Sequence, residues 1–343
     1  MERMTQNQAH YGALDGLRAL AAVGIVLMHV EANGYELKGF VFERLIPSFT
    51  NLVFLFMIIS GFAMCCGYYD KIVRSQITVE EFYSRRYAKL WPYFALLCLL
   101  DLLISPSLDA LYETFANLTL CFGLLPNAKI SVIGVGWFLG VVFVFYLLFP
   151  FFCYLLSDKK RAWLSFFAAL VFNFLCAVYF FDNAHMPENY EPRTNFVYCA
   201  VFFLGGGLIF LYREQAAKAA ERYRWVLLAA GLILTVGYYV MGSSVPIMLA
   251  LFAVFLIYAL GRGSRSGILQ NPVMKFLSSV SMEIYLCHMM VYRVIERLGM
   301  TDLFSSEILS YAATAVGTLA GSVLFAVLVK SGFNKIKRGR KHG

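Results

Sequence analysis

Long apolar stretches separated by short polar loops dominate this 343-residue chain. Several stretches contain no Asp, Glu, Lys, Arg or His and are long enough to cross about 30 Å of hydrocarbon; they are residues 45–69, 130–157, 162–181, 194–212, 225–261 and 308–329. Three further apolar segments carry isolated ionisable residues, at 13–31, 90–104 and 276–297. The turn residues at 242–246 divide the stretch 225–261 into two spans. The pattern predicts an all-α, polytopic membrane protein with about ten transmembrane helices.

The composition agrees with this pattern, since 60% of the residues are hydrophobic and 15% are charged. A water-soluble globule of this length could not bury so much apolar surface. The net charge of +8 is carried by short loops and by the C-terminal end, as in cytoplasmic loops, so we expect no nucleic-acid partner. The cysteines and histidines lack the spacing of a metal site, and no metal is expected.

The basic loops also predict a topology. Every basic loop falls on one side of the membrane only if segment 111–126 does not cross it, so we interpret that segment as re-entrant or interfacial. Both termini are then cytoplasmic, with a single membrane domain over residues 1–334 and a basic tail at 335–343. The loop 182–194, which contains Asp182, His185, Glu188 and Glu191, is predicted to lie outside.

Arg18 and His29 lie within the first predicted span. Eleven helical positions place them about 20° apart around the axis and about 16 Å apart along it. An ionisable group at bilayer depth costs about 3 kcal/mol, so such residues are functional candidates. Asp15, one turn before Arg18, can hold the guanidinium. A snorkelling arginine and a hydrogen-bonded histidine remain the structural alternative.

A second cluster lies in the aromatic and basic segment 82–93, before a span that we expect to begin near Pro92. Arg85, Arg86 and Lys89 stand within about one helical turn of one another. Arginine and lysine together suit a phosphate group. The alternative is a positive anchor with an aromatic belt.

The span 278–297 carries Ser281, Glu283, Tyr285 and His288. His288 can face the same cavity as His29, whereas Glu283 lies about 140° away around the helix and is not expected to touch His288. A histidine capped by a neighbouring helix is the alternative. Asp101 is another intramembrane acid, and its place near the outer end of a span predicts that it is solvated.

Two more motifs suggest packing when they are taken alone. Ser60 and Gly61 permit close approach of helices, and Trp137 is typical of an interfacial anchor.

Together these residues resemble the acyltransferase-3 family of integral membrane acyltransferases, which includes enzymes that O-acetylate surface polysaccharides. The matching motifs run from the first predicted span to the tenth: Leu14-Asp15-Gly16-Leu17-Arg18 with His29; Ile59-Ser60-Gly61-Phe62; Phe82-Tyr83-Ser84-Arg85-Arg86 with Trp91-Pro92-Tyr93; Trp137-Phe138-Leu139 with Tyr146-Leu147-Leu148-Phe149-Pro150; and Ile284-Tyr285-Leu286-Cys287-His288. The apolar Val141-Val142-Phe143, where many relatives carry an acid, places the chain nearer the compact sugar O-acetyltransferases.

The resemblance implies a donor and an acceptor. The donor is acyl-CoA, usually acetyl-CoA, used from the cytoplasm, and the acceptor is a hydroxyl of a glycan or lipid-linked sugar in a bacterial-type inner membrane. His29 matches the essential histidine of the family and Arg18 the arginine of the same motif. Arg86 and Lys89 match a basic pair that is commonly two arginines.

These matches give a hypothesis for the site. Arg85, Arg86 and Lys89, with Ser60 and Tyr93, would bind the donor, and its pantetheine arm would pass Arg18 toward His29. The catalytic group would comprise His29, as general base or acyl carrier, with Arg18, His288 and Asp15. We assign Trp137, Tyr285 and Glu283 to the acceptor.

Two other classes of function stay open from the sequence. One is a transporter or flippase of a glycolipid or organic anion, since buried Arg and His also line substrate paths. The other is a membrane sensing domain that binds acyl-CoA without transferring the acyl group.

Overall fold

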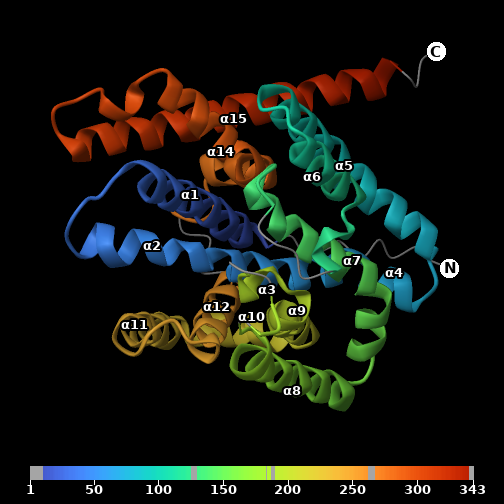
Figure 1. Ribbon diagram of the computed structural model, residues 1–343. Coiled ribbons are helices and arrows are strands. Elements are labelled where there is room, and N and C mark those ends of the chain that lie inside the picture. The colour runs from blue at the N-terminus through green and yellow to red at the C-terminus, as the bar shows by residue number, and fades with distance from the viewer. Residues whose placement is uncertain (1–10, 125–129, 183, 187–189, 262–266, 340–343) are drawn as a thin grey trace.

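The computed structural model describes residues 11–124, 130–182, 184–186, 190–261 and 267–339, and the regular structure in these ranges is helical. The segment 125–126, Glu188 and the last four residues of the predicted tail lie outside the described residues. Figure 1 shows the helices, whose bounds are α1 Gly12–Gly34, α2 Ile46–Ser48, α3 Leu52–Met64, α4 Asp70–Val73, α5 Val79–Ile104, α6 Leu108–Thr119, α7 Trp137–Leu156, α8 Lys159–Leu175, α9 Phe196–Leu211, α10 Arg213–Arg222, α11 Arg224–Met241, α12 Val245–Leu260, α13 Pro272–Ser279, α14 Ser281–Arg297 and α15 Glu307–Gly339.

The helical, multi-pass architecture is confirmed, but the count of ten spans is not. Within the described ranges, seven helices are long and apolar enough to cross a membrane, or up to eight if the bent pair α9 and α10 counts as one span. The helices α12 and α14 occupy the remaining predicted segments, but α12 has 16 residues and α14 has 17 residues with several charges. The predicted break between α11 and α12 is present.

Two predicted boundaries were wrong. The span expected to begin near Pro92 starts at Val79, because the Thr78 side chain caps the helix and Pro92 is accommodated inside it. The basic cluster therefore lies within α5 itself. The segment 276–297 is divided at Val280 into α13 and α14.

The region 111–126 contains no long helix in its described part. The helix α6 has 12 residues, about 18 Å of rise, and ends at Thr119. The next residue, Leu120, adopts a left-handed conformation with φ 57°. The short 3₁₀ segment Cys121–Leu124 then packs against α7. The helix α6 is too short to cross the bilayer alone.

The helices α1 and α3 lie in the middle of the bundle, with α14 and α15 on one side and α8 and α11 on the other (Figure 1). The helix α7 packs against α5, α8 and α9. The helices α3 and α9 approach so closely that a Cβ at Gly61 would lie 2.3 Å from the Phe203 carbonyl oxygen, and one at Gly206 would lie 2.1 Å from that of Ile58. Such small-residue contacts are the usual way in which helices pack in membranes.

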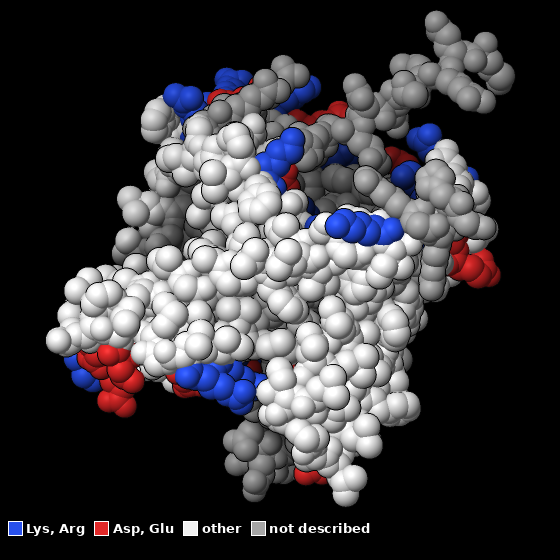
Figure 2. Space-filling model, turned by 90° about the horizontal axis from the view of Figure 1, so that it is seen from above, with Lys and Arg blue, Asp and Glu red and all other residues white. Residues whose placement is uncertain are grey.

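The surface has an apolar belt. Figure 2 shows a broad band without charged side chains, with Lys, Arg, Asp and Glu gathered along its margins. The helices α8 and α11 contribute many exposed apolar side chains to the surface, as expected for helices that face lipid.

The basic residues of several loops and helix ends meet at one end of the bundle. Arg213 and Arg18 are both close enough to Cys66 to interact with it electrostatically. Lys89 interacts in the same way with Arg86 and Lys330. We call this the basic end.

Candidate active site

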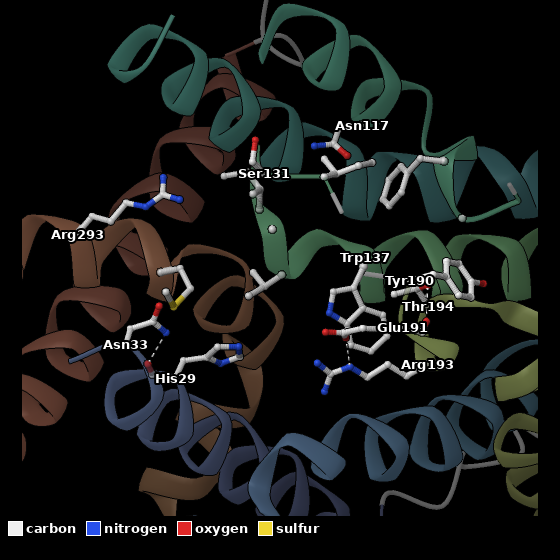
Figure 3. A pocket seen from close by; sticks show the side chains of 17 residues that line it. His29, Asn33, Asn117, Ser131, Trp137, Tyr190, Glu191, Arg193, Thr194 and Arg293 are labelled. Carbon is white, nitrogen blue, oxygen red and sulfur yellow. Dashed lines mark hydrogen bonds and ion pairs between the residues drawn. The ribbon is translucent and has the colours of Figure 1, made fainter. Parts of the chain in front are cut away.

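A cavity of about 380 Å³ lies beside His29, at the end of α1 opposite the basic end. Its walls come from α1, the loop before α7, the segment 190–194 and α14. Figure 3 shows the His29 imidazole on one side of the cavity and Trp137 with Arg193 on the other. Segments far apart in the chain thus enclose one space.

The histidines of α1 and α14 are in contact, as the sequence analysis allowed. Nε2 of His288 lies 3.1 Å from Nδ1 of His29, and the two rings are 4.9 Å apart at their centroids. His288 is fully buried, and it is not among the residues that line the cavity. Only the imidazole of His29 is therefore placed to meet a substrate there.

The hydrogen bonds define which nitrogens carry protons. Nδ1 of His288 lies 2.7 Å from the Tyr285 carbonyl oxygen, so it donates and Nε2 of a neutral His288 is an acceptor. Nδ1 of His29 lies between that acceptor and the Ile25 carbonyl oxygen, 3.0 Å away. Because both neighbours accept, Nδ1 of His29 bears the proton and its Nε2 keeps the free lone pair.

The wall opposite His29 combines an aromatic ring with an ion pair. Nε of Arg193 lies 2.5 Å from a Glu191 carboxylate oxygen, its guanidinium carbon lies 5.3 Å from the centroid of the Trp137 ring, and Nη1 donates to Thr50. Burial raises the pKa of Tyr190, so its phenol stays protonated. An aromatic face beside polar groups suits a sugar ring.

The loop before α7 forms a third wall and is fixed by carboxylates and an amide. Oε2 of Glu113 accepts hydrogen bonds from the backbone N–H and hydroxyl of Ser131 and from the backbone N–H of Val132, at 2.8–2.9 Å. Asn117 donates to the Val132 carbonyl oxygen at 2.8 Å. These bonds hold Ile133 in a left-handed conformation with φ 48°, which is unusual for a β-branched residue.

Asp101 belongs to the same arrangement, and the prediction that it is solvated was wrong. Its side chain is 7% exposed, with Oδ1 3.0 Å from Nη1 of Arg293 and Oδ2 accepting from the Ile133 backbone N–H at 3.1 Å. The loop and α14 cover a carboxylate that the linear sequence places near a helix end.

The basic end contains a second candidate group. The guanidinium of Arg86 lies 4.3 Å from the ring centroid of Tyr68 and 5.6 Å from that of Tyr146, and within the described residues its buried Nε has no hydrogen-bond partner. Arg18 also interacts electrostatically with Tyr146, and Lys89 interacts with both arginines. An anion bound here would meet several cations.

Asp15 holds Arg18 as the spacing predicted. Its Oδ1 lies 3.8 Å from Nη1 of Arg18 and accepts a hydrogen bond from Ser278 at 3.0 Å. Arg85, in contrast, is exposed and pairs with Glu81 on its own helix.

Other predicted site residues lie in packing positions. The Tyr93 hydroxyl donates to the Glu283 carbonyl oxygen, and the Tyr285 hydroxyl donates to the Val135 carbonyl oxygen behind the cavity wall. The Glu283 carboxylate pairs with Lys330 at 3.4 Å, away from the cavity lining. Ser60 is half-buried beside the close contact of Gly61 with α9.

The helices α1 and α7 both run between the basic end and the cavity beside His29. Along α1, Arg18 precedes His29 by about 16 Å, and along α7, Trp137 precedes Tyr146 by about 14 Å. Tyr146 lies with Arg18 and Trp137 shares the cavity with His29, so the helices run in opposite directions between the two levels. The side chains that line the described cavity do not include Arg18 or Arg86.

Several cavity residues were not assigned a role from the sequence. Asn33, Asn117, Arg193 and Arg293 line the cavity, and Glu191 was noted only as part of an outer loop. Their types are common on polar surfaces, and no local spacing distinguishes them. Among the described residues, no group of three or more His, Cys, Asp or Glu is arranged to hold a metal ion.

The described part of the chain is thus a multi-pass helical bundle with an imidazole in a cavity and cations at the other end. A comparison with protein families matches residues 11–327 to the model described as an acyltransferase domain, that of the acyltransferase-3 family. The chain therefore belongs to the acyltransferase-3 family and is a membrane acyltransferase. No curated protein and no solved structure matched the chain.

Proposed function

We propose that the protein transfers an acyl group, most simply acetyl, from cytosolic acyl-CoA to a hydroxyl of a cell-surface glycan or lipid-linked sugar. The observation that carries this proposal is the state of His29, whose Nδ1 proton is held by the His288 and Ile25 acceptors while its ring lines the cavity. A fixed imidazole with a free Nε2 is suited to remove a proton from an alcohol.

The reaction balances with His29 as general base. Nε2 takes the acceptor hydroxyl proton while the oxygen attacks the thioester carbonyl carbon, and the tetrahedral intermediate then expels the coenzyme A thiolate, which receives the proton. Arg193, which lines the same cavity as His29, is assigned to stabilise the developing oxyanion. An acyl-histidine relay is the alternative within the same class.

The donor is assigned to the basic end. Arg86 and Lys89, with Arg18 nearby, offer fork and point-charge contacts for the nucleotide phosphates. If this end is cytoplasmic, as the basic loops favour, the thioester arm extends from Arg18 toward His29. The cavity beside His29 then opens toward the outer side, where a membrane-bound glycan is available.

Labelled acetyl-CoA and candidate glycans, incubated with purified protein, test the proposal. We expect transfer in wild type and its loss in His29→Ala and His29→Gln, with donor binding retained. A labelled acyl group trapped on wild-type protein and absent from His29→Gln would favour the relay. Transfer that continues undiminished in His29→Ala would contradict the assignment.

A further inference from the structure

Arg293 occupies a fixed position in the cavity wall. It stands on α14, and its side chain is 47% exposed although Nη1 lies 3.0 Å from Oδ1 of the buried Asp101. The other oxygen of Asp101 accepts from the backbone of Ile133. The carboxylate thus joins the arginine to the loop that forms the next wall, and the guanidinium is held in place before any ligand arrives.

The two arginines of the cavity differ in what they can still bind. Arg193 contacts Glu191 through Nε and Thr50 through Nη1, so two of its three guanidinium nitrogens are already engaged. Arg293 contacts Asp101 through Nη1, and the described part of the chain provides no further hydrogen bond to it. Its Nε and Nη2 groups therefore remain for an oxyanion, which guanidinium binds in a bidentate manner.

Arg293 and His29 line the same cavity. Arg293 follows His288 by five residues on α14, about 7.5 Å along the axis and about 140° around it, so Arg293 lines the cavity while His288 stays buried behind His29. Figure 3 shows Arg293 on the same side of the cavity as His29, with Ser131 above. A ligand in this cavity of about 380 Å³ can therefore contact Arg293 and His29 at the same time.

We infer that the cavity accepts a sugar that carries an oxyanion, a phosphate or a carboxylate, next to the hydroxyl that is acylated. Arg293 binds the oxyanion, and Asp101 is the positioning residue that orients Arg293. This inference rests on the proposed function, because it takes His29 as the point of acyl transfer.

Purified wild-type protein is tested with labelled acetyl-CoA and three acceptors: methyl glucoside, methyl glucuronide and glucose 1-phosphate. We expect kcat/KM for at least one charged sugar to exceed that for methyl glucoside about tenfold or more. Arg293→Gln abolishes this preference, so that kcat/KM for the charged sugar falls to the value for methyl glucoside measured with the same variant. Glucose 1-phosphate alone identifies a phosphate, and methyl glucuronide alone a carboxylate.

Arg297→Gln is the matched control, because Arg297 is an exposed arginine one turn further along α14 that does not line the cavity. It removes the same charge near the same surface and should keep the preference. Asp101→Asn should raise KM for the charged acceptor more than it raises KM for methyl glucoside, because Arg293 loses the carboxylate that orients it.

Calorimetric titration of the three sugars into wild type, Arg293→Gln and Arg297→Gln provides a readout that does not need turnover. Binding of a charged sugar that is lost only in Arg293→Gln supports the inference. Equal binding of charged and neutral sugars, or binding that survives Arg293→Gln, overturns it. Failure of the proposed function is distinct, since transfer would then be independent of His29 or absent while the binding difference persists.

Discussion

His288 and His29 are joined by a contact of 3.1 Å between Nε2 and Nδ1, yet only His29 lines the cavity. We propose that the buried ring acts on the reaction through its partner. It accepts the Nδ1 proton of His29 and so keeps the lone pair of Nε2 available. This arrangement separates a residue that meets substrate from one that positions it.

Replacement of His288 should lower kcat more than it changes substrate binding. We expect His288→Leu to reduce kcat by about 10- to 100-fold and to shift the pH dependence of kcat, because the Nδ1 proton loses an acceptor. In His288→Gln, the amide oxygen can accept the same proton and should restore part of the rate. Equal loss in both variants, with unchanged pH profiles and reduced melting temperatures, would mean that His288 is only structural.

The basic end should determine affinity for the phosphates of the donor. Arg86→Gln and Lys89→Gln should each raise KM for acetyl-CoA by about tenfold, since charge-assisted contacts are lost. The same variants should use acetyl-pantetheine, which lacks the nucleotide, as well as wild type does. Arg85→Gln is the control, because Arg85 pairs with Glu81 at the surface. An equal effect of all three substitutions would indicate only a general loss of positive charge.

Trp137 should affect the acceptor and spare the donor. Trp137→Ala removes an aromatic cavity wall, and we expect KM for the acceptor to rise several-fold while KM for acetyl-CoA is unchanged. Trp137→Phe should retain most of the acceptor affinity. Trp163→Ala removes an indole from α8, away from the cavity lining, and serves as control. A larger effect on donor than on acceptor would contradict the assignment.

The contact between α3 and α9 should tolerate no added methyl group. A Cβ at Gly206 would lie 2.1 Å from the Ile58 carbonyl oxygen, so Gly206→Ala must separate the two helices and should cost about 1–3 kcal/mol of stability. Gly237→Ala, on the lipid-facing α11, meets no atom within 4 Å and should leave stability unchanged or raise it. Thermal unfolding in detergent compares the two. Similar melting temperatures would contradict this packing argument.

Local chemistry made part of the site predictable. The i,i+3 spacing of Asp15 and Arg18 placed two charges in contact, and the position of His29 in an apolar span identified it as a candidate before its neighbours were known. The approach of His288 was an open alternative, because two histidines on different helices meet only if those helices pack with the required rotation. For Arg85 the sequence pattern was less informative. The pattern groups it with the donor-binding residues, but in the structure it pairs with Glu81 on the same helix.

The sequence by itself determined that this chain is a multi-pass helical membrane protein, because apolar length and the location of charges follow from the cost of burying polar groups in lipid. The tertiary structure alone determined which residues line the cavity. The residues Arg193 and Arg293, on the segment 190–194 and on α14, became neighbours of His29 only through helix packing. Burial of Asp101 was decided in the same way, since a carboxylate at a helix end stays solvated unless a distant loop and an arginine cover it.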